Sequence, residues 1–95
     1  MQQWVIHAWD APDSVARRLE IRPDHLAGVR QLRTQDQFVL GGAMLSPEGD
    51  MIGSTMVVQF ETEDELQTYL AHEPYITAGV WARVEVFPFR VAKLD

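Results

Sequence analysis

The run from Trp4 to Trp9 constrains the fold more than any other feature of this sequence. It is aromatic and β-branched, as is typical of a buried strand. Alternate residues of a strand point to opposite faces, and here both sets contain bulky side chains, so both faces need cover. The chain has only 95 residues, and a domain of this size gains from a second subunit. One set is Trp4, Ile6 and Ala8, and the other is Val5, His7 and Trp9.

The segment after this strand is predicted to be helical from Ser14 to about Gln35. Asp13 or Ser14 is a candidate N-cap. Pro23 is most easily placed in the first turn of a second helical piece, because proline is favoured there and breaks helix interiors. The apolar stripe of the helix is formed by Leu26, Val29 and Leu32.

The rest of the chain alternates between strand and helix patterns. Strands are predicted over 38–45 and 51–61, joined by a turn at 46–50, and a last strand over 80–91. Between them a helix begins at Thr62, with Glu65 at the capping-box position, and ends at Pro74. The order β-α-β-β-α-β predicts a ferredoxin-like α+β fold, with a four-stranded antiparallel sheet and two helices on one face. We expect a single domain over residues 1–95.

Composition excludes several functions. Without cysteine the chain forms no disulfide and performs no thiolate chemistry. Its formal net charge of −6 disfavours nucleic-acid binding. No apolar run is long enough to span a bilayer and no leader pattern opens the chain, so we expect a cytoplasmic protein without a membrane partner. No phosphate or dinucleotide fingerprint is present, so no cofactor is predicted.

The basic residues gather in the first half of the chain, which suits a small anionic ligand. The alternative is that they solvate a helix and pair with nearby acids such as Glu20, Asp24 and Asp36. The clustered residues are Arg17, Arg18, Arg22, Arg30 and Arg33.

Several short motifs, in order along nearly the whole chain, resemble those of the YciI-like (YCII-related) family. Asp10 and Arg18 also resemble positions that the family uses upstream of the histidine. The motifs are Arg22-Pro23-Asp24-His25-Leu26 for R-P-x-H-L, Gly41-Gly42, the segment 49–54, Glu73-Pro74-Tyr75, and the runs 78–81 and 85–90.

This resemblance implies a ferredoxin-like dimer that forms an α/β barrel, related to the muconolactone-isomerase-like group. It also implies an active site built around a histidine and an acid, with elimination or isomerisation of small ring compounds in a few relatives. One position departs from the family pattern: the usual D-P-Y reads Glu73-Pro74-Tyr75, so the acid is one methylene longer and its reach toward His25 is altered.

Three residues are catalytic candidates. His25 is a natural proton shuttle near neutral pH, although a core histidine bonded to a backbone carbonyl is the alternative. Glu73 could orient it, as the acid of a triad does, or could be a solvated helix-end acid. Asp10 could take that orienting place, pair with Arg18 or Arg22, or cap the helix.

The remaining candidates would bind substrate. Ser54 could donate to a ligand oxygen, or merely pack in a strand bulge. An arginine could clamp a carboxylate. Aromatic side chains could line the pocket, although in a small domain they more often belong to the core or the dimer interface. No metal site is predicted, because His72 with His25 and Glu73 matches no zinc spacing. The binding candidates are Arg18, Arg22, Gly42, Gly53, Ser54, Tyr75 and Trp81.

These residues support two hypotheses. The first is a cofactor-independent enzyme in which His25 performs acid–base chemistry on a small anionic or ring substrate, by isomerisation, dehydration or elimination. The second is a non-catalytic dimer that binds a small molecule or a protein through the same pocket, since the fold hosts both kinds.

Overall fold

A four-stranded antiparallel sheet with the strand order β2-β3-β1-β4 is the frame of the molecule. A computed structural model describes residues 1–94 of the chain, so the last residue of the predicted domain, Asp95, lies outside the described part. The predicted β-α-β-β-α-β order is confirmed, with one extra helical turn, α3, before the last strand. The elements are β1 (Gln2–Asp10), α1 (Val15–Thr34), β2 (Phe38–Leu45), β3 (Met51–Phe60), α2 (Glu63–His72), α3 (Pro74–Thr77) and β4 (Trp81–Phe89).

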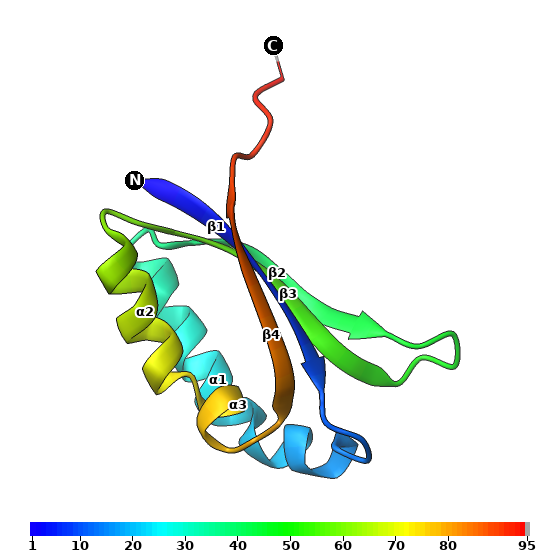
Figure 1. Cartoon of the computed structure of the whole chain (residues 1–95). Helices are drawn as coiled ribbons and strands as arrows, with labels where there is room; N and C mark the ends of the chain where they lie inside the picture. Colours follow the sequence, from blue (N-terminus) through cyan, green and yellow to red (C-terminus); the bar gives the residue numbers. More distant parts are fainter. Residues whose placement is uncertain (95) are drawn as a thin grey trace.

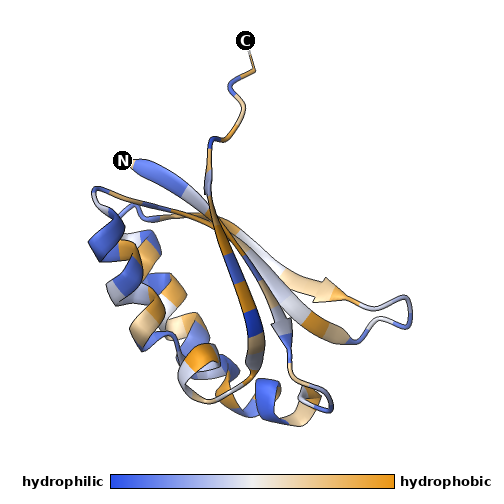
Figure 2. Cartoon of the chain, viewed as in Figure 1, coloured by the Kyte–Doolittle hydropathy of each residue, from blue (hydrophilic) through white to orange (hydrophobic). Residues whose placement is uncertain are grey.

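All three helices lie on the same side of the sheet (Figure 1). The hydrophobic core fills the space between them and the sheet, and β1 sends one of its two alternating sets into that core. In β4 hydrophilic and hydrophobic residues alternate, as expected for a strand with two different faces (Figure 2). The strand residues at the centre of the core are Trp4, Ile6, Ala8, Met56, Val58 and Phe60.

The first helix is one continuous element, which corrects the predicted break at Pro23. Proline removes the N–H that would bond the carbonyl of Leu19, one turn earlier. Both residues are exposed, so the proline lies on the solvent side of the helix, and the helix continues past it. The side chain of Ser14, at the N-cap position, makes no capping hydrogen bond. Because the helix is unbroken, Arg18 and His25 project from the same buried side, about two turns apart.

The predicted start of the second helix is confirmed. The Thr62 hydroxyl accepts a hydrogen bond from the Glu65 amide at 3.2 Å. The helix ends where Glu73 adopts an extended backbone conformation before Pro74, which begins the short α3. Glu73 therefore ends one helix and caps the next, and this double position fixes where its side chain points.

Within residues 1–94, no helix lies on the opposite face of the sheet (Figure 1). Its residues follow from the register, which places Leu40, Val57, Val5 and Phe87 in one apolar row across all four strands. Leu40 and Phe87 are about half exposed, at 52% and 50%. The next row is polar and contains His7, whose ring bonds the Thr55 hydroxyl at 3.0 Å. The chain alone leaves this face uncovered.

Candidate active site

The centre of the candidate site is a buried pair between α1 and the α2–α3 junction. His25 Nδ1 lies 2.7 Å from Glu73 Oε1, and their side chains are 10% and 1% exposed. A carboxylate has only acceptors, so the ring hydrogen of this bond belongs to Nδ1. Within residues 1–94 the other ring nitrogen, Nε2, makes no hydrogen bond, and His25 lines a cavity. The longer acid at position 73 therefore reaches the histidine.

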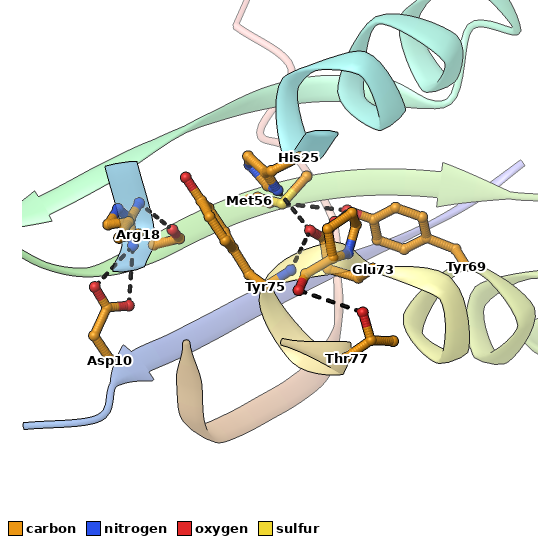
Figure 3. A network of polar contacts seen from close by, with 10 residues as sticks. Asp10, Arg18, His25, Met56, Tyr69, Glu73, Tyr75 and Thr77 are labelled. Atoms are coloured by element: carbon orange, nitrogen blue, oxygen red, sulfur yellow. Dashed lines mark hydrogen bonds and ion pairs between the residues drawn. The ribbon is translucent and has the colours of Figure 1, made fainter. Parts of the chain in front are cut away.

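Two further donors hold the Glu73 carboxylate (Figure 3). The Tyr75 amide donates to Oε1 at 3.1 Å, and the Tyr69 hydroxyl donates to Oε2 at 2.5 Å. Burial first, and the neighbouring Glu73 carboxylate second, raise the pKa of Tyr69 far above its ordinary value. The hydroxyl therefore stays a donor, and both oxygens of the carboxylate are fixed in place.

Aromatic rings frame the histidine. The Tyr75 ring stacks on His25 with centroids 4.1 Å apart and an angle of 17° between the planes. Trp81 meets His25 edge-on at 5.9 Å, and its ring nitrogen is buried without a partner in the described part of the chain. Tyr75 lines the cavity, whereas Trp81 does not line it and packs against the His25 ring. These contacts restrict the imidazole to one orientation.

A second buried cluster lies on the other side of Tyr75. Arg18 Nη1 donates to both Asp10 oxygens, at 2.9 and 3.1 Å, and Nη2 donates to the Ser54 hydroxyl at 2.7 Å. The Arg18 guanidinium lies 4.8 Å from the centre of the Tyr75 ring. Burial raises the pKa of Asp10, and the charge and hydrogen bonds of Arg18 act in the opposite direction. The hydrogen bonds pair Asp10 with Arg18, so Asp10 is not placed to orient His25.

The cavity beside both clusters has a volume of about 200 Å³. Arg22 lies on its rim, is exposed, and forms no ion pair with any residue between 1 and 94. Pockets for drug-sized ligands hold about 300–1,000 Å³, so this one suits a smaller molecule such as a single ring. The polar lining is Arg18, Arg22, His25, Ser54 and Tyr75, and the apolar lining includes Leu26, Val29, Phe38, Met51 and Met56.

The glycine candidates have different positions. Gly42 lines the cavity, and a side chain there would meet no atom within 4 Å. Gly53 does not line it: a Cβ at that position would lie 2.3 Å from the Ala8 carbonyl oxygen. The structure therefore explains Gly53 by the close approach of β1 and β3, rather than by a ligand.

Sequence reasoning missed Tyr69. It precedes Glu73 by four residues, a spacing that brings side chains together along a helix, and this spacing could have revealed the contact. The signal was weak, because Glu73 lies just past the helix end and its direction depends on the turn into α3.

The described residues include neither a cluster of metal-binding side chains nor a helix fit to span a membrane. No group of three or more histidine, aspartate or glutamate side chains is close enough to hold a metal ion in the part that the structure describes. None of the helices described is both long and apolar enough to cross a membrane.

The fold and the site define a class: ferredoxin-like α+β proteins with a buried histidine–carboxylate pair beside a small cavity. The chain belongs to the YCII-related domain family, whose pattern it matches over residues 2–90. It is 33% identical to Protein YciI of Escherichia coli O6:H1 over 93 residues, which covers 92% of this chain and 95% of that protein. It is 34% identical to an uncharacterized protein of Haemophilus influenzae over a stretch of the same length, with the same coverage.

A solved structure shares both the fold and part of the sequence. It is the 5-chloro-2-hydroxyhydroquinone dehydrochlorinase TftG of Burkholderia phenoliruptrix, in complex with 2,5-dihydroxybenzoquinone. The TM-score is 0.86 at 25% identity, and the match covers 95% of each chain. The ferredoxin-like fold is thereby confirmed, and a known enzyme has this architecture.

Proposed function

We propose that this protein is a cofactor-independent enzyme in which His25 moves a proton to or from a small ring substrate. The observation that carries the proposal is the His25–Glu73 pair, since Glu73 binds Nδ1, Nε2 has no partner within residues 1–94, and His25 lines the cavity. A general acid or base needs a free titratable atom within reach of the substrate and a partner that fixes its orientation.

The reaction class follows from the groups that line the cavity. They include no thiol, and the one serine, Ser54, is bonded to Arg18 rather than to a histidine. A proton shuttle without an activated nucleophile suits isomerisation, dehydration or elimination better than hydrolysis. The name of TftG describes elimination of this kind on a hydroxylated ring, which supports the same class for this chain.

The substrate we propose is a single hydroxylated ring or a similarly small anion. The cavity volume limits its size, and the exposed guanidinium of Arg22 on the rim supplies an attractive charge for an acidic hydroxyl or a carboxylate. Arg18 contributes positive charge from beneath Tyr75, although its bonds to Asp10 and Ser54 limit it to a supporting role.

The test is turnover of a panel of hydroxylated hydroquinones with and without a leaving group, followed by absorbance. We expect His25→Ala to reduce turnover by about 10²- to 10⁴-fold while the circular dichroism spectrum is unchanged. The matched control is His72→Ala, since His72 is exposed and, in the described part of the chain, bonds only the Thr68 carbonyl. Full turnover by His25→Ala would refute the proposal. Binding of ring compounds without conversion would favour the non-catalytic module.

We also propose that two copies of the chain pack through the open sheet face. The proposal is supported by the apolar row that contains Leu40 and Phe87, because exposed patches of this kind mark association surfaces. Sedimentation at micromolar concentration should give the mass of a dimer for the wild type and of a monomer for Leu40→Arg. Leu19→Arg on α1 is the control, because Leu19 is 54% exposed on the helical side. A wild-type monomer would contradict this proposal.

A further inference from the structure

Tyr69 makes the only side-chain hydrogen bond to Glu73 Oε2 in the part of the chain that the structure describes. The other oxygen, Oε1, is shared by His25 and the Tyr75 amide. The terminal torsion of a glutamate is broad and has weak preferences of its own. A carboxylate held at one oxygen can therefore rotate, whereas one held at both oxygens keeps a fixed plane toward His25.

Tyr69 is itself held firmly. Its ring packs near Phe60, with centroids 6.1 Å apart, and its hydroxyl also lies 3.7 Å from the Met56 sulfur. Both neighbours belong to β3 and are buried. Since burial also keeps the hydroxyl protonated, Tyr69 presents a permanent donor from a rigid support. The position of the carboxylate is thus tied to the sheet as well as to the helices.

Tyr69 does not reach the substrate cavity. It lines a separate groove between α1 and α2 and is absent from the lining of the cavity beside His25. Tyr69 therefore does not contact a ring bound at His25. It would affect a reaction at His25 only through Glu73.

We propose that Tyr69 is a positioning residue, which fixes Glu73 so that the carboxylate holds His25 in the orientation that leaves Nε2 toward the substrate. The inference deepens the proposed function and rests on it for any effect on turnover. It also explains why a glutamate works at this position. The side chain spans from the junction of α2 and α3 to both Tyr69 and His25, and we expect an aspartate, which is one methylene shorter, to lose one of these contacts.

The direct test is Tyr69→Phe, which keeps the ring and removes only the hydroxyl. The readout is NMR of ¹⁵N-histidine protein at about pH 9, where an ordinary imidazole is neutral and its tautomer can be read from the nitrogen shifts. The His25 signals are assigned by their loss in His25→Ala. We expect wild-type His25 to carry its hydrogen on Nδ1. In Tyr69→Phe that hydrogen should exchange with solvent about tenfold faster. A tenfold change in rate corresponds to the net free energy of about one ordinary hydrogen bond.

Ser54→Ala is the matched control for losing one buried hydroxyl, because Ser54 bonds Arg18 and not Glu73. It should leave the exchange rate of the His25 hydrogen as in the wild type. Equal rates in wild type and Tyr69→Phe would overturn the proposal, and so would the same acceleration in Ser54→Ala, since general loosening would then explain the effect.

Glu73→Asp alone keeps the test decisive if Tyr69→Phe does not fold, and we expect the shorter acid to accelerate exchange to a similar extent. Where Tyr69→Phe folds, the double variant should add little beyond either single change, because both break one chain of contacts. Wild-type exchange in Glu73→Asp, or additive effects of the two changes, would count against the positioning role.

Turnover separates this inference from the proposed function. If the wild type converts a substrate, Tyr69→Phe should lower kcat by up to about 100-fold with little change in KM, since Tyr69 lies outside the cavity. Unchanged kcat in that variant would contradict the positioning role. If no substrate is converted but exchange of the His25 hydrogen responds to Tyr69→Phe, the positioning role stands and the enzymatic proposal fails.

Discussion

Two buried polar clusters flank the ring of Tyr75, and they differ in what they leave for a ligand (Figure 3). Around Arg18, both terminal nitrogens of the guanidinium are bonded, one to Asp10 and the other to Ser54. Around Glu73, every carboxylate oxygen is bonded, but its partner His25 keeps one ring nitrogen free within residues 1–94. The first cluster is closed at its charged ends, although the buried Arg18 Nε has no partner in the described part of the chain. The second cluster ends in a ring nitrogen that can transfer a proton.

This difference teaches that burial of charged groups is a poor guide to catalysis by itself. Both pairs are nearly inaccessible, with side-chain exposures of 4% and 4% in one and 10% and 1% in the other. A closed ion pair mainly ties elements together, here β1, α1 and β3. An imidazole with one fixed and one free nitrogen can transfer a proton. The two clusters should therefore respond differently to mutation.

The largest expected effect is on turnover, from Glu73→Gln. The Tyr75 amide donates to the same oxygen as His25, so the glutamine oxygen should stay at that position and its N–H₂ should face the Tyr69 hydroxyl oxygen. His25 would keep its hydrogen on Nδ1 but lose the carboxylate charge that stabilises the imidazolium formed during proton transfer. We therefore expect kcat to fall by about 10²- to 10⁴-fold.

The tautomer itself gives the second readout of Glu73→Gln. Nitrogen NMR shifts of His25 should keep the Nδ1–H pattern, and a move to the Nε2–H pattern would show that the glutamine had turned its N–H₂ toward His25. Asp10→Asn serves as the comparison, because Asp10 contacts Arg18 and should leave the His25 pattern unchanged. A similar shift in both variants would mean that the two clusters act as one.

The second effect is on stability, from Arg18→Met. The change leaves the Asp10 carboxylate buried without its partner, and breaking a buried pair in this way costs about 3–5 kcal/mol. Urea unfolding followed by circular dichroism measures the loss. Adding Asp10→Leu should recover most of it, because both partners are then apolar. A small loss in Arg18→Met would show that the closed cluster contributes little to the fold.

The third and smallest effect is a pH dependence of stability, which arises from the two tyrosines beside Glu73 and His25. Burial raises the pKa of Tyr69 and of Tyr75, whose ordinary value is 10.0. A raised pKa in the fold means that both hydroxyls keep their protons above pH 10, where the unfolded chain loses them. Stability is therefore complete below that pH and falls above it, by at most about 1.4 kcal/mol per pH unit for each tyrosine.

Tyrosinate absorbance and urea unfolding, measured across this pH range, check the prediction. Folded protein should show little tyrosinate signal until it unfolds, and Tyr69→Phe should reduce the slope of stability with pH by about half. Normal titration of two tyrosines in the folded protein would show that these hydroxyls are open to solvent.

Much of the fold could be predicted from local patterns. Alternation along β1 and the capping box at Thr62 depend on neighbouring residues, so the order of strands and helices along the chain and the start of the second helix were predicted correctly. Pro23 was misplaced, because whether a helix tolerates proline depends on which side of it faces water. That exposure is set by packing against the sheet, which no local pattern contains.

The candidate site divides in the same way. The motif around His25 and the acid at Glu73 indicated the pair, and the structure brings them within 2.7 Å across 48 residues of chain. The choice of Arg18 as the partner of Asp10, and of Tyr69 as an anchor for Glu73, was beyond the sequence. Several groups of suitable chemistry were available, and only their distances select among them.

The sequence by itself determined the element order, the two-sided β1 strand and the residue types able to transfer a proton. These follow from periodicity and chemistry within short segments. The tertiary structure alone decided that Glu73, past the end of α2, points at His25 while Asp10 points at Arg18. The physical reason is that hydrogen bonds act over about 3 Å, and which groups come that close depends on how the helices pack on the sheet.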